Sequence, residues 1–302
     1  VISLFTFGRL GVPVFLFLTG YLLLDRTYDD KGVQRFYRHN FLPLVLTTEF
    51  WILIYEVFIS WYTSLPVDVV ETLKDLLFLK QCNLSHMWYM PMIIGMYLGI
   101  PLMSNAVKTC NLRYLELLIG IAFIVLFCPP VLNTFLYAEG KESINFCLDF
   151  SWTGGIYGIM MLSGYCVKKG VFAAVKTPFV VLVGMFSFIV TVYAQYFSNV
   201  RNIDCGVWYN SGSLILCSFS VFLLIKRWNP KERKLVAQIS IFSFGIYLIH
   251  NPVLMILLKY MPMAESVKKI IVLMFFTFIL TYGIIYTLSK FKVFRHLLMI
   301  KS

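Results

Sequence analysis

The sequence has few charged residues. Only 14% of its 302 residues are Asp, Glu, Lys or Arg, whereas a soluble domain carries about a quarter. Hydrophobic residues make up 59% of the chain and occur in long blocks separated by short polar stretches. The sequence therefore excludes an ordinary water-soluble domain, and we expect most of the chain to lie in lipid.

Several motifs that identify enzyme classes are also missing. The sequence contains no Walker A loop, no dinucleotide fingerprint, no HExxH or GxSxG pattern, and no cysteine–histidine cluster with metal-ligand spacing. We therefore expect no metal. The net charge of +11 could suggest nucleic acid, but the basic residues lie in short loops between apolar blocks. That placement indicates contact with anionic lipid instead.

The apolar blocks predict an all-α bundle of about nine transmembrane helices in a single domain over residues 1–302. Polar turns are too far apart for the strands of a membrane barrel. A span needs about 20 mostly apolar residues. The expected spans are Leu10–Leu24, Phe41–Ser60, Met87–Met103, Tyr114–Phe127, Trp152–Val167, Phe179–Phe197, Trp208–Ile225, Ile239–Leu258 and Ile270–Leu288.

Basic residues orient these spans. Most of the 26 Lys and Arg residues fall in alternate loops, and the positive-inside rule places those loops in the cytoplasm. The protein is therefore expected in the plasma (inner) membrane with a cytoplasmic C-terminus. An outside start at Val1, without a signal sequence, predicts one further helix before it. Cys82, Cys147 and Cys205 fall in outside loops, where two of them can form a disulfide; the pairing stays open.

The first candidate site is Arg35-Phe36-Tyr37-Arg38 in the first cytoplasmic loop. In a helix the two arginines lie one turn apart, and two guanidinium groups together suit a phosphorylated ligand. The alternative is simple anchoring of the loop on the cytoplasmic side.

The second candidate is Ser85-His86-Met87-Trp88-Tyr89, which enters the third span from outside. His86 can act as a base or bind a sugar hydroxyl, and Trp88 and Tyr89 can stack on a sugar ring. The alternative is a belt of aromatic side chains at the membrane interface.

The third candidate is a polar stripe on the eighth span. Ser243, Tyr247 and His250 have i, i+4, i+7 spacing and so share one face of an otherwise apolar helix. In lipid this face should point into the bundle, either as a reactive site or as a structural hydrogen-bond network.

Two acidic residues and four glycines are the remaining candidates for a functional or packing role. Glu49 and Glu56 lie on one face of the second span, where they can line a polar cavity, carry protons or pair with an arginine; Glu49 is assigned to substrate binding. Close helix packing is expected at four glycines, namely Gly20, Gly154, Gly155 and Gly164.

Taken together, these segments resemble the membrane-bound acyltransferase-3 family. The resemblance rests on the run from Gly11 to Leu23, with Leu16 and Thr19 as mild variants, and on three further motifs in family order. These are Arg35–Arg38 with Pro43, His86–Tyr89 with Tyr97 and Pro101, and Ser243–His250.

The resemblance implies a ten-helix membrane acyltransferase that uses cytoplasmic acyl-CoA, usually acetyl-CoA. The acceptor would be a hydroxyl of a cell-envelope glycan, a lipid-linked sugar or a related molecule. Arg35 and Arg38 would contact the phosphates of coenzyme A, and His86, Tyr247 and His250 would take part in catalysis. The family's presumed principal histidine belongs to a first helix that would precede Val1.

Two other classes remain open at this stage. The intramembrane acids suit a transporter or flippase of envelope precursors, although no inverted repeat is visible. A membrane module that serves a partner enzyme is the other alternative. The acceptor, the acyl group, the direction of transfer and the oligomeric state also stay open.

Overall fold

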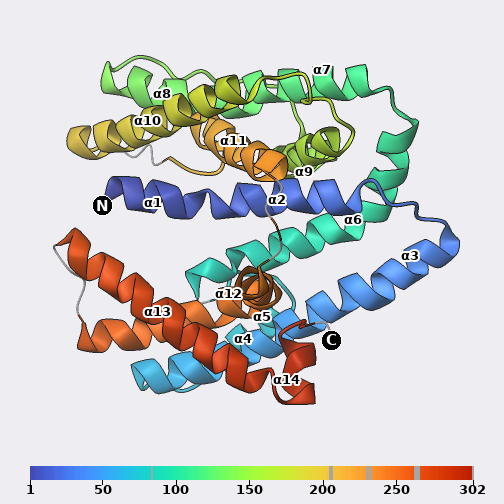
Figure 1. Cartoon of the computed structure of the whole chain (residues 1–302). Coiled ribbons are helices and arrows are strands. Elements are labelled where there is room, and N and C mark those ends of the chain that lie inside the picture. The colour runs from blue at the N-terminus through green and yellow to red at the C-terminus, as the bar shows by residue number, and fades with distance from the viewer. Residues whose placement is uncertain (83, 204–206, 229–230, 232, 262–265, 301–302) are drawn as a thin grey trace. The chain divides into compact units, whose positions relative to one another are not determined.

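The computed structural model describes residues 1–82, 84–203, 207–228, 231, 233–261 and 266–300. Within these residues every regular element is helical (Figure 1). Seven helices of the described chain are long and apolar enough to cross a membrane: Ile2–Leu23, Asp30–Thr63, Ser85–Thr109, Leu112–Ala138, Thr177–Arg201, Lys234–Tyr260 and Val267–Leu288. The expected polytopic helical membrane protein is therefore confirmed.

The chain divides into two compact units, and the first comprises Val1–Asp30 and Gly99–Pro230. Helix α2 packs against α9 and α11, and α10 packs against α11. The helices of this unit are α1 (Ile2–Arg9), α2 (Gly11–Leu23), the second part of α6 (Tyr89–Thr109), α7 (Leu112–Ala122), η3 (Phe123–Phe127), α8 (Cys128–Ala138), η4 (Ser151–Thr153), α9 (Gly155–Lys168), α10 (Thr177–Arg201) and α11 (Gly212–Trp228).

The second unit comprises Lys31–Leu98 and Lys231–Ser302. Helix α4 packs against α5, and α12 packs against α13. Its helices are α3 (Asp30–Phe36), η1 (Tyr37–Phe41), α4 (Leu42–Thr63), α5 (Val69–Leu76), η2 (Ser85–Trp88), the first part of α6, α12 (Lys234–Tyr260), α13 (Val267–Leu288) and α14 (Lys292–Leu297). All candidate catalytic and binding residues predicted from the sequence belong to this unit.

Two of the nine expected spans are short. Helices α9 and α11 form where spans are expected, but they have 14 and 17 residues. At 1.5 Å per residue they measure about 21 and 26 Å, less than the ~30 Å thickness of the hydrocarbon core. Helix α9 is an internal helix, with an unbroken buried stretch from Gly158 to Val167.

The first expected span, Leu10–Leu24, begins too late. The helical stretch starts at Ile2, so Arg9 lies within it rather than at its outer edge. The Arg9 guanidinium lies over the rings of Phe5 and Trp208, with its carbon 4.1 and 4.9 Å from their centroids. Aromatic faces thus help to accommodate a charge inside an apolar helix.

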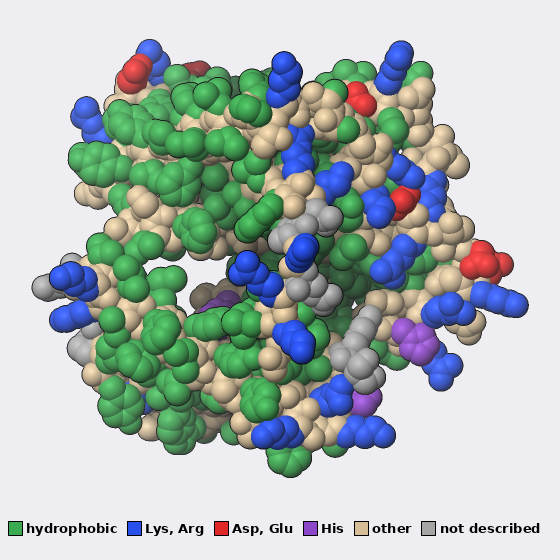
Figure 2. Space-filling model, viewed as in Figure 1, with side chains coloured by type: hydrophobic (Ala, Val, Ile, Leu, Met, Phe, Trp, Pro, Cys, Tyr) green, Lys and Arg blue, Asp and Glu red, His purple; other side chains and the backbone are tan. Residues whose placement is uncertain are grey.

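The surface of the helices is largely apolar. On α13 the side chains of Ile271, Phe275, Phe278 and Ile279 are all exposed. Figure 2 shows hydrophobic side chains over much of the face in view. A surface of this kind is unfavourable in water but suits the hydrocarbon of a bilayer.

The expected disulfide among the outside cysteines stays a prediction. In the structure Cys82 is half-buried and Cys147 is exposed. Cys205, the third candidate, lies outside the described residues.

Tyrosine hydroxyls join α4 to α12. Tyr55 Oη donates to the Leu248 carbonyl (2.6 Å), and Tyr62 Oη donates to the Met255 carbonyl (3.3 Å). Both donors and both acceptors are seven residues apart, so the two helices run parallel. Because lipid offers no competing partner, such bonds fix the register of the pair.

The short helix α5 follows α4 and is held at both ends. Asp68 caps its N-terminus by accepting from the backbone N–H groups of Val70 and Glu71. Glu71 accepts from Lys74 (2.6 Å) and Lys80 (2.7 Å), and these bonds lower the pKa of its carboxyl to about 2. Lys80 thereby fastens the segment after α5 back onto the helix.

Candidate active site

The structure brings two of the predicted catalytic histidines together. His86 lies in η2, just before α6, and His250 lies in α12. Their ring centroids are 5.0 Å apart, with the ring planes at 77°. The two residues are far apart in the sequence, so the fold alone creates this pair.

His250 is held by its own helix. Its Nδ1 lies 2.6 Å from the Tyr247 carbonyl oxygen and 3.1 Å from the Ile246 carbonyl oxygen. A carbonyl only accepts, so Nδ1 is assigned as the N–H donor, and the neutral ring then carries its lone pair on Nε2. A histidine oriented in this way is suited to accept a proton at Nε2.

The His86 ring has no hydrogen bond of normal geometry among the described residues. Both of its ring nitrogens are buried, and neither has a partner of normal geometry in the described part of the chain. Aromatic rings surround it instead: Tyr247 at 5.3 Å and Tyr55 at 5.8 Å between centroids. Buried polar atoms without partners are rare in folded proteins and are a common feature of reactive sites.

Tyr247 positions the His86 segment. Its hydroxyl donates to the backbone carbonyl of His86 at 2.6 Å. The phenol proton is therefore engaged with the His86 segment in this arrangement. Ser243, the third member of the predicted stripe, bonds to the Ser240 carbonyl of its own helix instead (2.8 Å).

The predicted substrate-binding residues fall into two groups. Tyr89 lies against Tyr247, with centroids 5.8 Å apart, and Trp88 packs edge-on against Tyr89 at 6.0 Å. These two aromatics therefore extend the histidine cluster. Glu49 lies two turns before Glu56 on α4 and is half-buried, and no described contact links it to the histidines.

Arg35 and Arg38 are exposed, while the aromatic residues between them anchor the segment. Phe36 is buried, and Tyr37 Oη donates to the Leu98 carbonyl on α6 (2.8 Å). Within the described residues neither arginine forms an ion pair. Both guanidinium groups are thus free to meet an anion.

A basic cleft of about 790 Å³ lies in the same unit, and the sequence pattern did not indicate it. Its residues come from η1, from the first turn of α4 and from the end of the chain, and the first of them, His39, directly follows Arg38. Five of its eight lining side chains are cationic or can become so. The lining comprises His39, Pro43, Lys290, Lys292, Arg295, His296, Met299 and Ile300.

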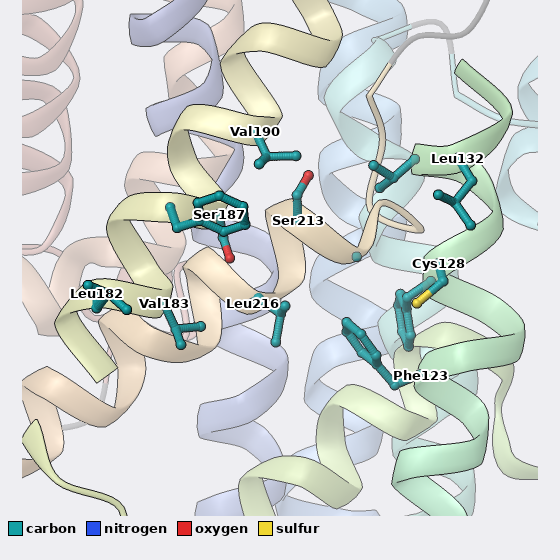
Figure 3. Close-up of a pocket in the computed structure, with 13 residues that line it drawn as sticks. Phe123, Cys128, Leu132, Leu182, Val183, Ser187, Val190, Ser213 and Leu216 are labelled. Carbon is teal, nitrogen blue, oxygen red and sulfur yellow. The ribbon is translucent and has the colours of Figure 1, made fainter. Parts of the chain in front are cut away.

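The first unit contains an apolar cavity of about 410 Å³ between η3, α8, α10 and α11 (Figure 3). Its walls are almost entirely hydrophobic, and Ser187, Ser213 and Cys128 supply the only polar side chains. Such a cavity suits a hydrocarbon chain, but it offers no base for acyl transfer. None of the predicted site residues lines it.

Comparison with known families identifies the family of the chain. The family model described as an acyltransferase domain (Acyl_transf_3) matches residues 1–290. No curated protein and no solved structure gives a significant match. Since the matched region spans nearly the whole chain, including both histidines and the Arg35–Arg38 segment, the protein belongs to the acyltransferase-3 family of membrane acyltransferases.

Proposed function

We propose that this protein transfers an acyl group, usually acetyl, from cytoplasmic acyl-CoA to a hydroxyl of a cell-envelope glycan or a lipid-linked sugar. The observation that carries the proposal is the half-buried pair of His86 and His250, with His250 Nδ1 fixed by backbone carbonyls. Two imidazoles in contact can move a proton at the reacting atoms. An acyl transfer needs two such proton transfers, one from the attacking hydroxyl and one to the leaving thiolate.

The reaction is assigned to these residues in two steps. His250 Nε2 takes the proton from the acceptor hydroxyl, and the oxygen attacks the thioester carbonyl carbon. A ring N–H of His86 donates to the developing oxyanion. The tetrahedral intermediate then collapses, the carbon–sulfur bond breaks, and the departing thiolate of coenzyme A receives the proton from His250. Trp88 and Tyr89 supply aromatic faces for the acceptor's sugar ring.

The donor would be held by its phosphates. Arg35 and Arg38 present two unpaired guanidinium groups, and the basic cleft next to them in the chain adds three more permanent cations. Guanidinium groups bind phosphate oxygens through paired, charge-assisted hydrogen bonds. The diphosphate and the 3′-phosphate of coenzyme A together match such an extended basic surface.

Replacing both Arg35 and Arg38 by Ala is expected to weaken acetyl-CoA binding by about tenfold or more, because hydrogen bonds to charged groups contribute ~1.5–3 kcal/mol each. Calorimetry on the purified protein in detergent measures the change. The matched control is Lys108→Ala/Arg113→Ala, which removes two cations from another predicted cytoplasmic loop and should leave the affinity unchanged. Equal affinities for all three proteins would remove the arginines from the donor site.

The proposed orientation makes a second prediction. Cys110 and Cys147 are both exposed, but the charge pattern places Cys110 in the cytoplasm and Cys147 outside. In intact cells a membrane-impermeant maleimide should label a variant that keeps only Cys147, and should label one that keeps only Cys110 after lysis alone. The reverse pattern would invert the topology and place the basic cleft on the wrong side for cytoplasmic acyl-CoA.

A further inference from the structure

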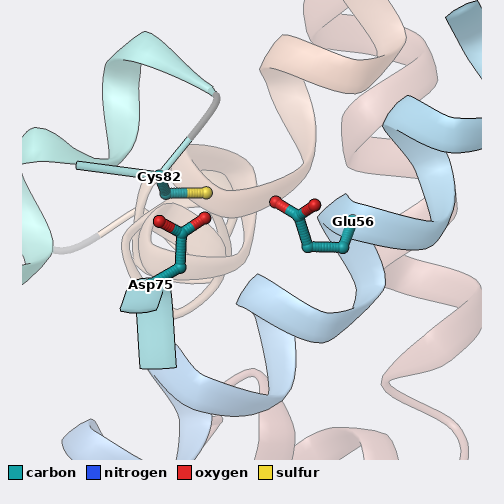
Figure 4. Close-up of side chains that lie close together, drawn as sticks. All are labelled: Glu56, Asp75 and Cys82. Carbon is teal, nitrogen blue, oxygen red and sulfur yellow. The ribbon is translucent and has the colours of Figure 1, made fainter. Parts of the chain in front are cut away.

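Three side chains that can bind a metal converge beside the histidine cluster (Figure 4). Glu56 comes from α4, Asp75 from α5, and Cys82 from the segment that follows α5. Their carboxylate oxygens and the thiol sulfur all lie within 4.8 Å of one another. In Figure 4 the Asp75 and Glu56 carboxylates and the Cys82 thiol point toward a common space.

Asp75 occupies the position that most needs a ligand. Its side chain is only 1% exposed, and neither carboxylate oxygen has a hydrogen-bond partner of normal geometry in the described part of the chain, although Glu56 and Lys80 lie close to it. The nearest cation, Lys80 Nζ, is 3.6 Å from Oδ1 and is already bound to Glu71 at 2.7 Å. A buried carboxylate without hydrogen bonds is strongly unfavourable, so a further positive charge is expected here.

The chemistry of the three ligands selects the kind of cation. Two carboxylates and a thiolate carry three negative charges, and Lys80 is already bound to Glu71, so a divalent ion offsets most of the charge of the cluster. Mg²⁺ and Ca²⁺ take oxygen ligands and do not use thiolates. Zn²⁺ accepts sulfur and carboxylate oxygen together in a tetrahedral site.

We infer that Glu56, Asp75 and Cys82 form a zinc site with its fourth position open to water. Zinc–oxygen and zinc–sulfur bonds of about 2.0–2.3 Å place tetrahedral ligand atoms roughly 3.5 Å apart. The cluster has to contract by about 1 Å to reach this geometry, and side-chain rotations of Glu56 and Cys82 supply that movement.

The ion would fix the segment that carries His86. Cys82 is four residues before His86, and Tyr55, next to Glu56 on α4, packs against the His86 ring at 5.8 Å. Coordination ties α4, α5 and this segment together, immediately beside the proposed reacting groups. No sequence signal indicated the site, because residues 56, 75 and 82 do not follow any metal-binding spacing.

The experiment uses the full-length protein in detergent, stripped with a chelator and titrated with Co²⁺ in the absence of acyl-CoA. We expect one equivalent to bind, with a thiolate-to-cobalt charge-transfer band that Zn²⁺ abolishes. Cys82→Ser should lose the band, and Asp75→Asn and Glu56→Gln should each weaken binding at least tenfold. The matched control Cys147→Ser, which alters an exposed cysteine of the first unit, should bind as the wild type does.

A second variant distinguishes the loss of a metal ligand from misfolding. Cys82→Asp retains a ligand of the right charge, so it should keep Zn²⁺ binding by competition and a Zn²⁺-dependent rise in melting temperature, without the cobalt band. The inference is overturned if the wild type binds no Co²⁺, as expected when the two carboxyl groups merely share a proton. It is equally overturned if the band survives in Cys82→Ser, or if Cys82 is found in a disulfide with Cys205.

Discussion

His86→Ala and His250→Ala should each lower kcat for acyl transfer by roughly 10²–10⁴, the range that general acid–base groups contribute. The two rings are in contact, and the proposed mechanism gives them different roles: His250 Nε2 transfers the proton and His86 donates to the oxyanion. Binding of acyl-CoA should change little, since the proposal places its phosphates at Arg35, Arg38 and the basic cleft. Steady-state kinetics with an acceptor sugar, together with calorimetric affinity for acetyl-CoA, separate the two effects.

The remaining two histidines provide a matched control. His39 and His296 line the basic cleft, so their replacement by Ala should raise KM for acyl-CoA and leave kcat within about twofold. A purely structural role for His86 and His250 makes a different prediction. In that case the loss of activity would follow the loss of folded protein in thermal unfolding. The loss of kcat would then be proportional to the loss of stability in all four variants.

The sequence was sufficient to find both halves of the histidine cluster, though not to join them. Tyr247 and His250 share a polar face on an apolar helix, and His86 begins another span, so each motif needed a partner inside the bundle. Only the fold shows that they partner one another. The hydrogen bond from Tyr247 to the His86 carbonyl links residues 161 positions apart, and no local pattern encodes it.

The sequence did not predict the basic cleft or the cluster of Glu56, Asp75 and Cys82, and the reasons differ. Lys290, Lys292 and Arg295 were already explained by the positive-inside rule, so their second role as one wall of a cleft had no separate signal. Asp75 lies in a short amphipathic helix between spans, where an acid is ordinarily exposed. Its burial depends on how α5 packs onto α4, which local sequence does not determine.

The four glycines expected at helix contacts fall into two pairs with different roles. Gly20 and Gly164 do allow close packing, because α2 and α9 meet there backbone to backbone. Gly154 and Gly155 serve another purpose: both have positive φ values, 85° and 59°, at the start of α9. That backbone conformation favours glycine irrespective of any neighbour. Sequence alone cannot distinguish the two uses of the residue.

Gly20→Ala and Gly164→Ala should each destabilise the first unit by at least the ~1–3 kcal/mol that overpacking usually costs. A Cβ on Gly20 would overlap the backbone carbonyl of Met161, and a Cβ on Gly164 would overlap that of Phe17. Backbone atoms cannot rotate away as a side-chain terminus can, so the two helices must separate. Tryptophan-monitored thermal unfolding in detergent measures the loss.

Gly20 and Gly164 each contact the other's helix, so a double variant tests the prediction most directly. Because each glycine faces the residue three positions from the other, one separation of α2 from α9 relieves both overlaps. The double variant should therefore cost clearly less than the sum of the single variants, the non-additivity expected of residues in contact. Gly8→Ala is the control: it adds a Cβ to the same membrane-spanning stretch with no atom within 4 Å, and should be neutral or slightly stabilising. Additive losses, or an equal loss in Gly8→Ala, would show that the close contact between α2 and α9 is not the cause of the destabilisation.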